Sequence, residues 1–334
     1  MSVELLNFIE TVLNGLMSGI MYSLVALGFV LIFKASGVFN FAQGVFALFA
    51  ALTLVGFQTG QIPFSHLINE LFGTNLHNWY PSLHSFLAIL LTIVTMVILA
   101  WLVERLVLRH LVNQEPIILF MATIGLAFVL EGVGDLMWGS DVKVLDVGIP
   151  SGGSIWLEEA TIGWASEGSE YYGMYIDVLN VWATIVAVIL VTALALFSQY
   201  TKTGRALRAV ADDHQAALSV GISLRSIWIL VWAISGFIAM VAGIMWGTES
   251  GVQFSLSLIA LKALPVLILG GFTSIPGAII GGLLIGVGEK LAEIYIGGLL
   301  DIGAIENWFA YVLALVFLLF RPQGLFGDKI IERV

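Results

Sequence analysis

Two carboxylic acids in the middle of an apolar segment are the first residues whose type and spacing could do chemistry. Glu131 and Asp135 are four residues apart within 116–138, so a helix would place both on one face. Such pairs can act as general acid and base, but an acid inside an apolar helix more often faces a cavity or a partner. Asp135 lies near enough to the segment's end to reach the surface. Glu131 lies deeper and is either part of a polar pathway or a hydrogen-bonded structural acid.

A second group of polar residues, Asn40, Gln43 and Gly44, enters another apolar segment at 39–58. Buried amides cost free energy unless they are hydrogen-bonded. The two amides therefore either connect neighbouring helices or line a polar path, and we keep Asn40, Gln43, Gly44 and Glu131 as candidates for a substrate pathway.

Other kinds of chemistry find no support in the sequence. There is no cysteine, and no Ser/His/Asp arrangement suggests nucleophilic catalysis. His66, His77 and His84 have no metal-ligand spacing, so no metal site is expected, and "GVGEKL" at 286–291 lacks the pattern of a phosphate-binding loop. We expect neither an enzyme nor a cofactor bound by this chain.

The longest polar run within the second half of the chain is residues 201–223. Between Gly204 and Gly221 it has no proline and no internal glycine, which predicts a helix. One face would carry Arg205, Arg208, Asp212, Gln215 and Ser219, with Arg208 and Asp212 spaced to pair, and a second stripe would carry Leu207, Val210, His214 and Leu218. The helix is either a connector on a membrane surface or a docking element. Its shallow, alanine-rich stripe favours docking.

The elements that position these residues must be membrane helices. Of the 334 residues, 59% are hydrophobic and 11% charged, and the mean hydropathy is +1.01. Soluble domains carry about 25% charged residues. The net charge of -10 argues against nucleic-acid binding. Glu4 and Glu10 stand where a signal peptide would be basic, so we interpret the first apolar run as a retained span.

About nine apolar segments are expected in one all-α membrane domain covering 1–334. They lie near 9–33, 39–58, 84–106, 116–138, 178–198, 225–248, 258–272, 277–297 and 304–320. The seventh and eighth are separated at Pro276, which lacks an amide donor and disfavours helix in the residue before it. Three glycine pairs inside spans, Gly15/Gly19, Gly277/Gly281 and Gly282/Gly286, predict close helix packing.

Positive charge predicts the orientation. Ten of the 13 lysines and arginines fall on one side of this layout: Lys34, Arg105, Arg109, Lys202, Arg205, Arg208, Arg225, Arg321, Lys329 and Arg333. Positive residues stay in the cytoplasm, so the N-terminus is expected outside and the C-terminus inside. Residues 139–177, rich in acidic and aromatic side chains, then form an external loop, either merely solvated or a face for an external partner. Residues 199–224 form a cytoplasmic loop.

Several stretches resemble one transporter family in the family's order. They are "NGLMSGIMYSLVALGFVLIFKASGVFNFAQG" (14–44), "ERLVLRHL" (104–111), "ATIGLAFVLEGVGDLMWGSD" (122–141), "GRALRAVADD" (204–213), "ALPVLILGGFTSIPGAIIGGLLIG" (263–286) and "RPQGLFG" (321–327). The sequence is similar to the H-type permeases of branched-chain amino-acid ABC importers, with urea and short-amide importers as near relatives. Many members have His and Glu where Gln43 and Val45 stand here, which leaves the substrate open.

The resemblance implies a permease subunit of the bacterial inner membrane that forms a translocation path with a second permease, a related M-type chain or another copy of itself. It implies two ATPase subunits that use ATP, docked on a coupling loop with Gly204, Arg205, Arg208, Ala209, Asp212, Ala217 and Gly221, and an external substrate-binding protein. Two rivals remain. A carrier without ATP could use the proline-interrupted segment 258–297, although the acids within spans lack basic partners at similar depth. A membrane enzyme acting on lipids would need a catalytic set that the sequence lacks.

Overall fold

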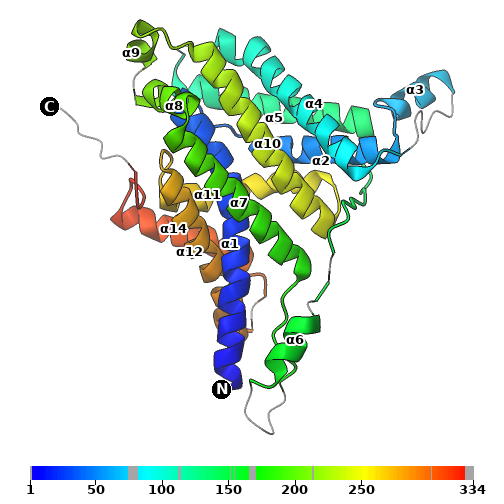
Figure 1. Cartoon of the computed structure of the whole chain (residues 1–334), viewed down its shortest axis with the longest axis vertical. Helices are drawn as coiled ribbons and strands as arrows, with labels where there is room; N and C mark the ends of the chain where they lie inside the picture. Colours follow the sequence, from blue (N-terminus) through cyan, green and yellow to red (C-terminus); the bar gives the residue numbers. More distant parts are fainter. Residues whose placement is uncertain are drawn as a thin grey trace. The chain divides into compact units, whose positions relative to one another are not determined.

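The computed structural model of the chain is helical. It describes residues 2–73, 82–111, 114–150, 152–153, 155–164, 171–212, 214–301 and 303–327, and within these it contains no β-strand beyond two isolated bridges. The helices are α1 (Val3–Ser36), α2 (Gln43–Thr59), α3 (Ser65–Phe72), α4 (Ser85–Leu106), α5 (Pro116–Trp138), α6 (Ile155–Ile162), α7 (Val178–Tyr200), α8 (Lys202–Asp212), α9 (His214–Ser219), α10 (Leu224–Ser250), α11 (Ile259–Gly270), α12 (Ile275–Leu291), α13 (Gly298–Leu300) and α14 (Glu306–Phe320) (Figure 1). Short 3-10 turns lie at Leu108–His110 (η1) and Phe254–Leu258 (η2), and a π-helical turn at Ala292–Gly297 (η3).

Six of the described helices are long and apolar enough to cross a bilayer, which identifies an integral membrane protein. They are α1, α4 with η1, α5, α7, α10, and α12 with its extension to Leu300, and three shorter apolar stretches cover Gln43–Thr59, Phe254–Gly270 and Glu306–Phe320. Each of the nine expected segments thus coincides with an apolar helix. How many of them cross the membrane, and in which direction, stays a prediction.

The expected interruption near Pro276 is observed. Helix α11 ends at Gly270 and α12 begins at Ile275, with Ser274 as N-cap accepting a hydrogen bond from the Gly277 amide at 3.0 Å. The break is held by the segment after α14, because the amide of Leu325 donates to the carbonyl oxygen of Leu269 at 2.8 Å.

The described residues divide into two compact units, each built from stretches far apart in the sequence. The first contains residues 1–26, 149–193 and 262–334, and the second contains 27–148 and 194–261. We describe each by itself.

In the second unit, α2, α4, α5 and α10 pack side by side (Figure 1). Its largest fully buried side chains include Trp138, Trp232 and Phe46, and the rings of Phe46 and Trp232 meet edge to face. Apart from Asp135, the exposed side chains of α5 are apolar where the structure describes them, as Phe128 and Val129 illustrate with 69% and 61% exposure. A helix that is apolar on its outward side fits a lipid environment.

In the first unit, glycines bring the backbones of α1 and α12 together. A Cβ on Gly19 would lie 2.6 Å from the carbonyl oxygen of Gly282, and one on Gly15 would lie 2.7 Å from the Cα of Val287. Ser23 adds a hydrogen bond from its hydroxyl to the carbonyl oxygen of Ile279 at 3.2 Å. The glycines thus sit where any side chain would separate the two helices.

The two glycine pairs of α12 have the same four-residue spacing in the sequence, but they pack against different helices. Gly286 belongs to the contact with α1, because a Cβ there would collide with the carbonyl oxygen of Gly15. Gly277 and Gly281 instead lie against α11, and a Cβ on Gly281 would lie 2.7 Å from the carbonyl oxygen of Val266. The four glycines of these two pairs therefore allow α12 to approach two neighbours closely, α1 and α11.

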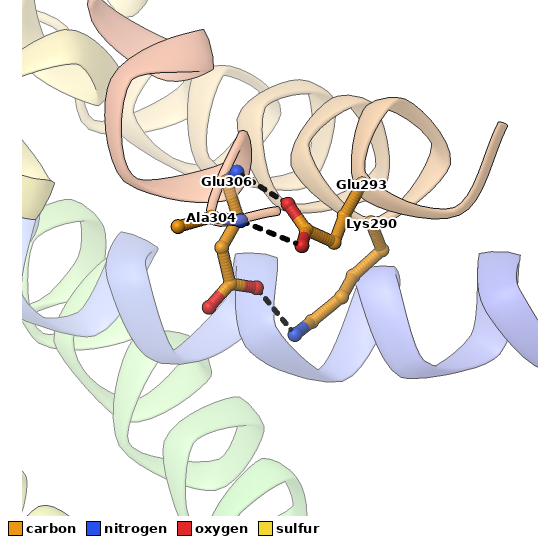
Figure 2. A network of polar contacts seen from close by, with 4 residues as sticks. All are labelled: Lys290, Glu293, Ala304 and Glu306. Atoms are coloured by element: carbon orange, nitrogen blue, oxygen red, sulfur yellow. Dashed lines mark hydrogen bonds and ion pairs between the residues drawn. The ribbon is translucent and has the colours of Figure 1, made fainter. Parts of the chain in front are cut away.

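The turn between α12 and α14, also in the first unit, is held by charged side chains (Figure 2). The Glu293 carboxylate accepts hydrogen bonds from the amides of Ala304 and Glu306 at 3.1 and 2.9 Å, so it satisfies free amides at the start of α14. Lys290 forms an ion pair with Glu306 at 2.8 Å.

Part of the acidic segment 139–177 is folded in the first unit. Leu6 in the first turns of α1 packs with Tyr171 and Met174, and the amide of Met174 donates to the hydroxyl of Thr161 on α6 at 2.8 Å. The described part of this segment is therefore more ordered than a solvated loop.

Candidate functional site

The polar segment, residues 199–224, forms two short helices in the second unit. Helix α8 begins at Lys202, two residues before Gly204, so Gly204 lies inside the helix and not at its start. Gly204 is buried, and a Cβ there would collide with the carbonyl oxygen of Phe197. Helix α9 follows from His214, and Gly221 ends the segment with φ at +83°, which favours glycine.

The two faces of this segment differ in burial. Leu207 and Val210 are buried, whereas Arg205 and Asp212 are exposed. Leu218 on α9, the last residue of the expected apolar stripe, is 54% exposed and remains accessible to a partner. Ala209 is half-buried and Ala217 is buried.

Arg208 makes a different contact from the pair with Asp212 that its spacing predicts. Its Nη2 donates to the carbonyl oxygen of Gln199 at 3.3 Å, which satisfies a free carbonyl at the end of α7. Arg205 is exposed and is the more accessible cation of the two. Asp213, His77, Lys329 and Arg333 lie outside the described residues, as do the side chains of His66 and His214.

The amides of Asn40 and Gln43 form a closed hydrogen-bond network within the second unit. The side-chain oxygen of Gln43 accepts from Asn40 Nδ2 at 3.2 Å and from the Ser235 hydroxyl on α10 at 2.7 Å. Gln43 Nε2 in turn donates to the Ser235 carbonyl oxygen at 3.2 Å, and all three side chains are buried. In this state the amides connect helices, and their place on a pathway stays a proposal.

Close backbone approaches surround this amide network. A Cβ on Gly28 of α1 would collide with the Gln43 amide, and one on Gly44 would collide with the carbonyl oxygen of Ser257 in η2. The Ser235 hydroxyl also lies 3.1 Å from the carbonyl oxygen of Gly28, within hydrogen-bond distance. The network therefore contacts α1, α2 and α10 at one place.

Glu131 is half-buried on α5, and Asp135 is exposed. The hydrogen bonds of the amide network, within the part of the chain that the structure describes, involve neither acid. A place for Glu131 on the same pathway stays a proposal.

Two buried acids have basic neighbours, which corrects the expectation that acids within spans lack them. Glu104 at the end of α4 is 2% exposed and faces Arg225 of α10, with Nε and Oε1 3.7 Å apart. Glu289, near the end of α12, is buried, hydrogen-bonded to Tyr22 and within electrostatic range of Lys262 and Lys290. Sequence spacing could not reveal these partners, because most of them come from a different helix.

Lys143, in the loop after α5, is the one basic residue of the segment 139–177. Its ammonium donates to the side-chain oxygen of Gln61 at 3.3 Å. Burial lowers the pKa of Lys143, and the negative charge of Asp141 partly opposes this.

Sequence reasoning did not indicate that Ser235 bonds the amide network or that Glu104 pairs with Arg225. A signal for two of them exists, because Arg225 and Ser235 share one face of α10 with Trp228 and Trp232 at spacings of three and four. Glu104 lies in the stretch "ERLVLRHL", but nothing in its immediate neighbourhood indicates its partner.

Comparison with known proteins agrees with the geometry. The family model "Branched-chain amino acid transport system / permease component" matches residues 11–321. The branched-chain amino acid transport permease LivH of Escherichia coli is 29% identical, with 100% of both chains covered. Its counterpart BraD of Pseudomonas aeruginosa is 27% identical over 99% of both chains, and a probable LivH of Methanocaldococcus jannaschii is 29% identical over 91% of this chain and 88% of its own. This chain belongs to the family of permease components of branched-chain amino acid transport systems.

Proposed function

We propose that this chain is a permease subunit of an ATP-driven importer for branched-chain amino acids in the bacterial inner membrane. The observation that carries the proposal is the family match, which extends over residues 11–321 and includes the polar segment. The relatives named for branched-chain amino acids match along their whole length, so urea and short amides are not favoured as substrates.

The polar segment is the proposed contact with a partner ATPase. Its inward residues Leu207 and Val210 fix α8 to its own unit, whereas Arg205, Asp212 and Leu218 are left accessible. Exposed polar and apolar side chains side by side on a short helical segment suit a protein partner better than a lipid surface. ATP is used by that partner, and this chain binds no cofactor in the proposal.

The remaining partners follow from the proposed role. A second permease, an M-type chain or a second copy, would complete the pathway, and a substrate-binding protein would deliver the amino acid from outside. The proposed orientation places the N-terminus outside and the polar segment in the cytoplasm, because Lys202, Arg205 and Arg208 gather there.

A purified complex in proteoliposomes tests the proposal. Mild-detergent isolation of this chain should yield two ATPase subunits and a second permease, and the reconstituted complex with its binding protein should take up radiolabelled leucine, isoleucine or valine only with ATP. Arg205→Glu should reduce uptake while this chain stays inserted, because it reverses a charge on the accessible face without removing the bond that Arg208 makes. Lys290→Gln, at the ion pair of the α12–α14 turn in the first unit, is the charge-removing control.

Either of two results would contradict the proposal. One is a chain that purifies without any ATPase. The other is uptake that proceeds equally without ATP, which would point to a carrier.

A further inference from the structure

One face of α10 links the polar segment to the buried amide network. Arg225, Trp228 and Ser235 follow helical spacing along this face, and each bonds or pairs with another element of the second unit. Arg225 pairs with Glu104 of α4, the Trp228 indole donates to the carbonyl oxygen of Ala35 at 3.3 Å, and the Ser235 hydroxyl bonds Gln43. Between them Trp232 is fully buried against Phe46.

The short linker between α9 and α10 is bonded to α9 at one end and caps α10 at the other. The amides of Gly221 and Ile222 donate to the carbonyl oxygens of Leu218 and Ala217, both at 3.0 Å, and Ser223 caps α10. Helices α8 and α9 also contact α10. We expect a displacement of the polar segment to move the turn of α10 that carries Arg225, because the linker is short and α8 and α9 contact α10.

The side chains of Glu104 and Arg225 face each other in this structure without forming a close hydrogen bond. The Nε–Oε1 distance of 3.7 Å exceeds the roughly 2.7–2.9 Å of a charge-assisted hydrogen bond. The second carboxylate oxygen, Oε2, is buried without a hydrogen-bond partner among the described residues. Because guanidinium and carboxylate can join through two parallel bonds, a small movement of the first turn of α10 would close the pair and satisfy that oxygen.

We propose that the Glu104–Arg225 pair is a positioning contact that closes when the polar segment moves, and that the face of α10 carries this movement to Ser235 and Gln43. The face of α10 that carries Arg225, Trp228 and Ser235 would then shift as a whole. The hydrogen bonds around Gln43 would break and re-form with the ATP cycle. This inference rests on the proposed function, because it requires a partner that moves the polar segment.

The test uses the reconstituted complex and compares ATP hydrolysis with uptake of a radiolabelled branched-chain amino acid. Glu104→Gln and Arg225→Gln should leave basal ATP hydrolysis within about twofold and lower uptake per ATP by about fivefold or more, the range of typical coupling energies. The double variant should be no worse than either single one, because both remove one interaction. Arg105→Gln is the matched control, since this neighbouring arginine is exposed and stacks on Trp101 of its own helix.

A distance measurement keeps the inference testable if the variants assemble poorly. The chain has no cysteine, so spin labels can be placed at Leu106→Cys on α4 and Ser226→Cys on α10, both exposed positions. The distance between the labels should change on ATP binding in the otherwise unmodified complex. An unchanged distance between the two labels, or unchanged uptake per ATP in Glu104→Gln, would overturn this inference but leave the proposed importer function intact. A complex with no ATP-dependent uptake at all would overturn the proposed function and this inference with it.

Discussion

The contact between α1 and α12 predicts a large difference between two substitutions that look alike in the sequence. Gly19 lies in α1 and Gly125 in α5, both inside apolar helices. A Cβ on Gly19 would lie 2.6 Å from the carbonyl oxygen of Gly282 and 2.8 Å from the Cα of Leu283, whereas a Cβ on Gly125 would meet nothing within 4 Å.

The magnitude follows from this geometry. The nearest atom to a Cβ at position 19 is backbone, about 0.9 Å closer than the ~3.5 Å of ordinary contact, so the two helices must move apart. A gap of this size forfeits about a quarter to a half of each dispersion contact along the interface, and overpacking typically costs about 1–3 kcal/mol. Alanine is also a better helix former than glycine by about 0.8–1.0 kcal/mol, and this gain is common to both variants. Gly19→Ala should therefore be less stable than Gly125→Ala by about 1–3 kcal/mol.

Unfolding in mild detergent, followed by tryptophan fluorescence, measures the difference, since the chain has 10 tryptophans. Gly282→Ala should behave like Gly19→Ala, because its Cβ would lie 2.6 Å from the carbonyl oxygen of Gly19. Equal stability of Gly19→Ala and Gly125→Ala would refute the reasoning, since it would mean that α1 and α12 are not in backbone contact.

Three further predictions concern other parts of the chain. Gln43→Leu removes the three hydrogen bonds of the Gln43 side chain and should lower stability by about 2–3 kcal/mol, at about 0.6–1 kcal/mol for each lost bond; unchanged unfolding would speak against the buried network. With Tyr172→Cys and Val220→Cys, both highly exposed positions, a membrane-impermeant maleimide should label only the first in intact cells, and the reverse pattern would contradict the proposed orientation. The unfolded chain binds more protons than the folded one between the lowered pKa of Lys143 and its usual 10.5, so stability should rise with pH through that window. Lys143→Met should abolish the rise in unfolding experiments at different pH, and an identical pH profile would exclude a contribution of this lysine.

The spans and their interruption could be predicted because they depend on local properties. Apolar runs of sufficient length form helices whatever their neighbours, and Pro276 cannot continue a helix whichever unit contains it. The length of α1 could not be predicted, since its first turns are helical where Leu6 packs against Tyr171 and Met174, more than 160 residues later in the chain.

The candidate site could be predicted only where a side chain's partner is near in sequence. Asn40 and Gln43 bond each other three residues apart, but the third member, Ser235, comes from α10. Glu289 lies beside Lys290 and near the end of its own helix, yet it is buried and hydrogen-bonded to Tyr22 of α1. Burial of an acid is decided by the helix opposite, which no local pattern encodes.

The short helix α14 has a consequence for the lipid around it. Its 15 residues span about 22 Å, whereas the hydrocarbon core of a typical bilayer is about 30 Å thick. Leu315, Leu319 and Phe320 are 61%, 75% and 81% exposed, so acyl chains can meet this helix directly. If α14 crosses the membrane as proposed, we expect the bilayer beside it to be thinner than elsewhere, at a cost that grows with each ångström of mismatch. Membranes with short acyl chains should therefore suit this protein better than thick, sterol-rich ones.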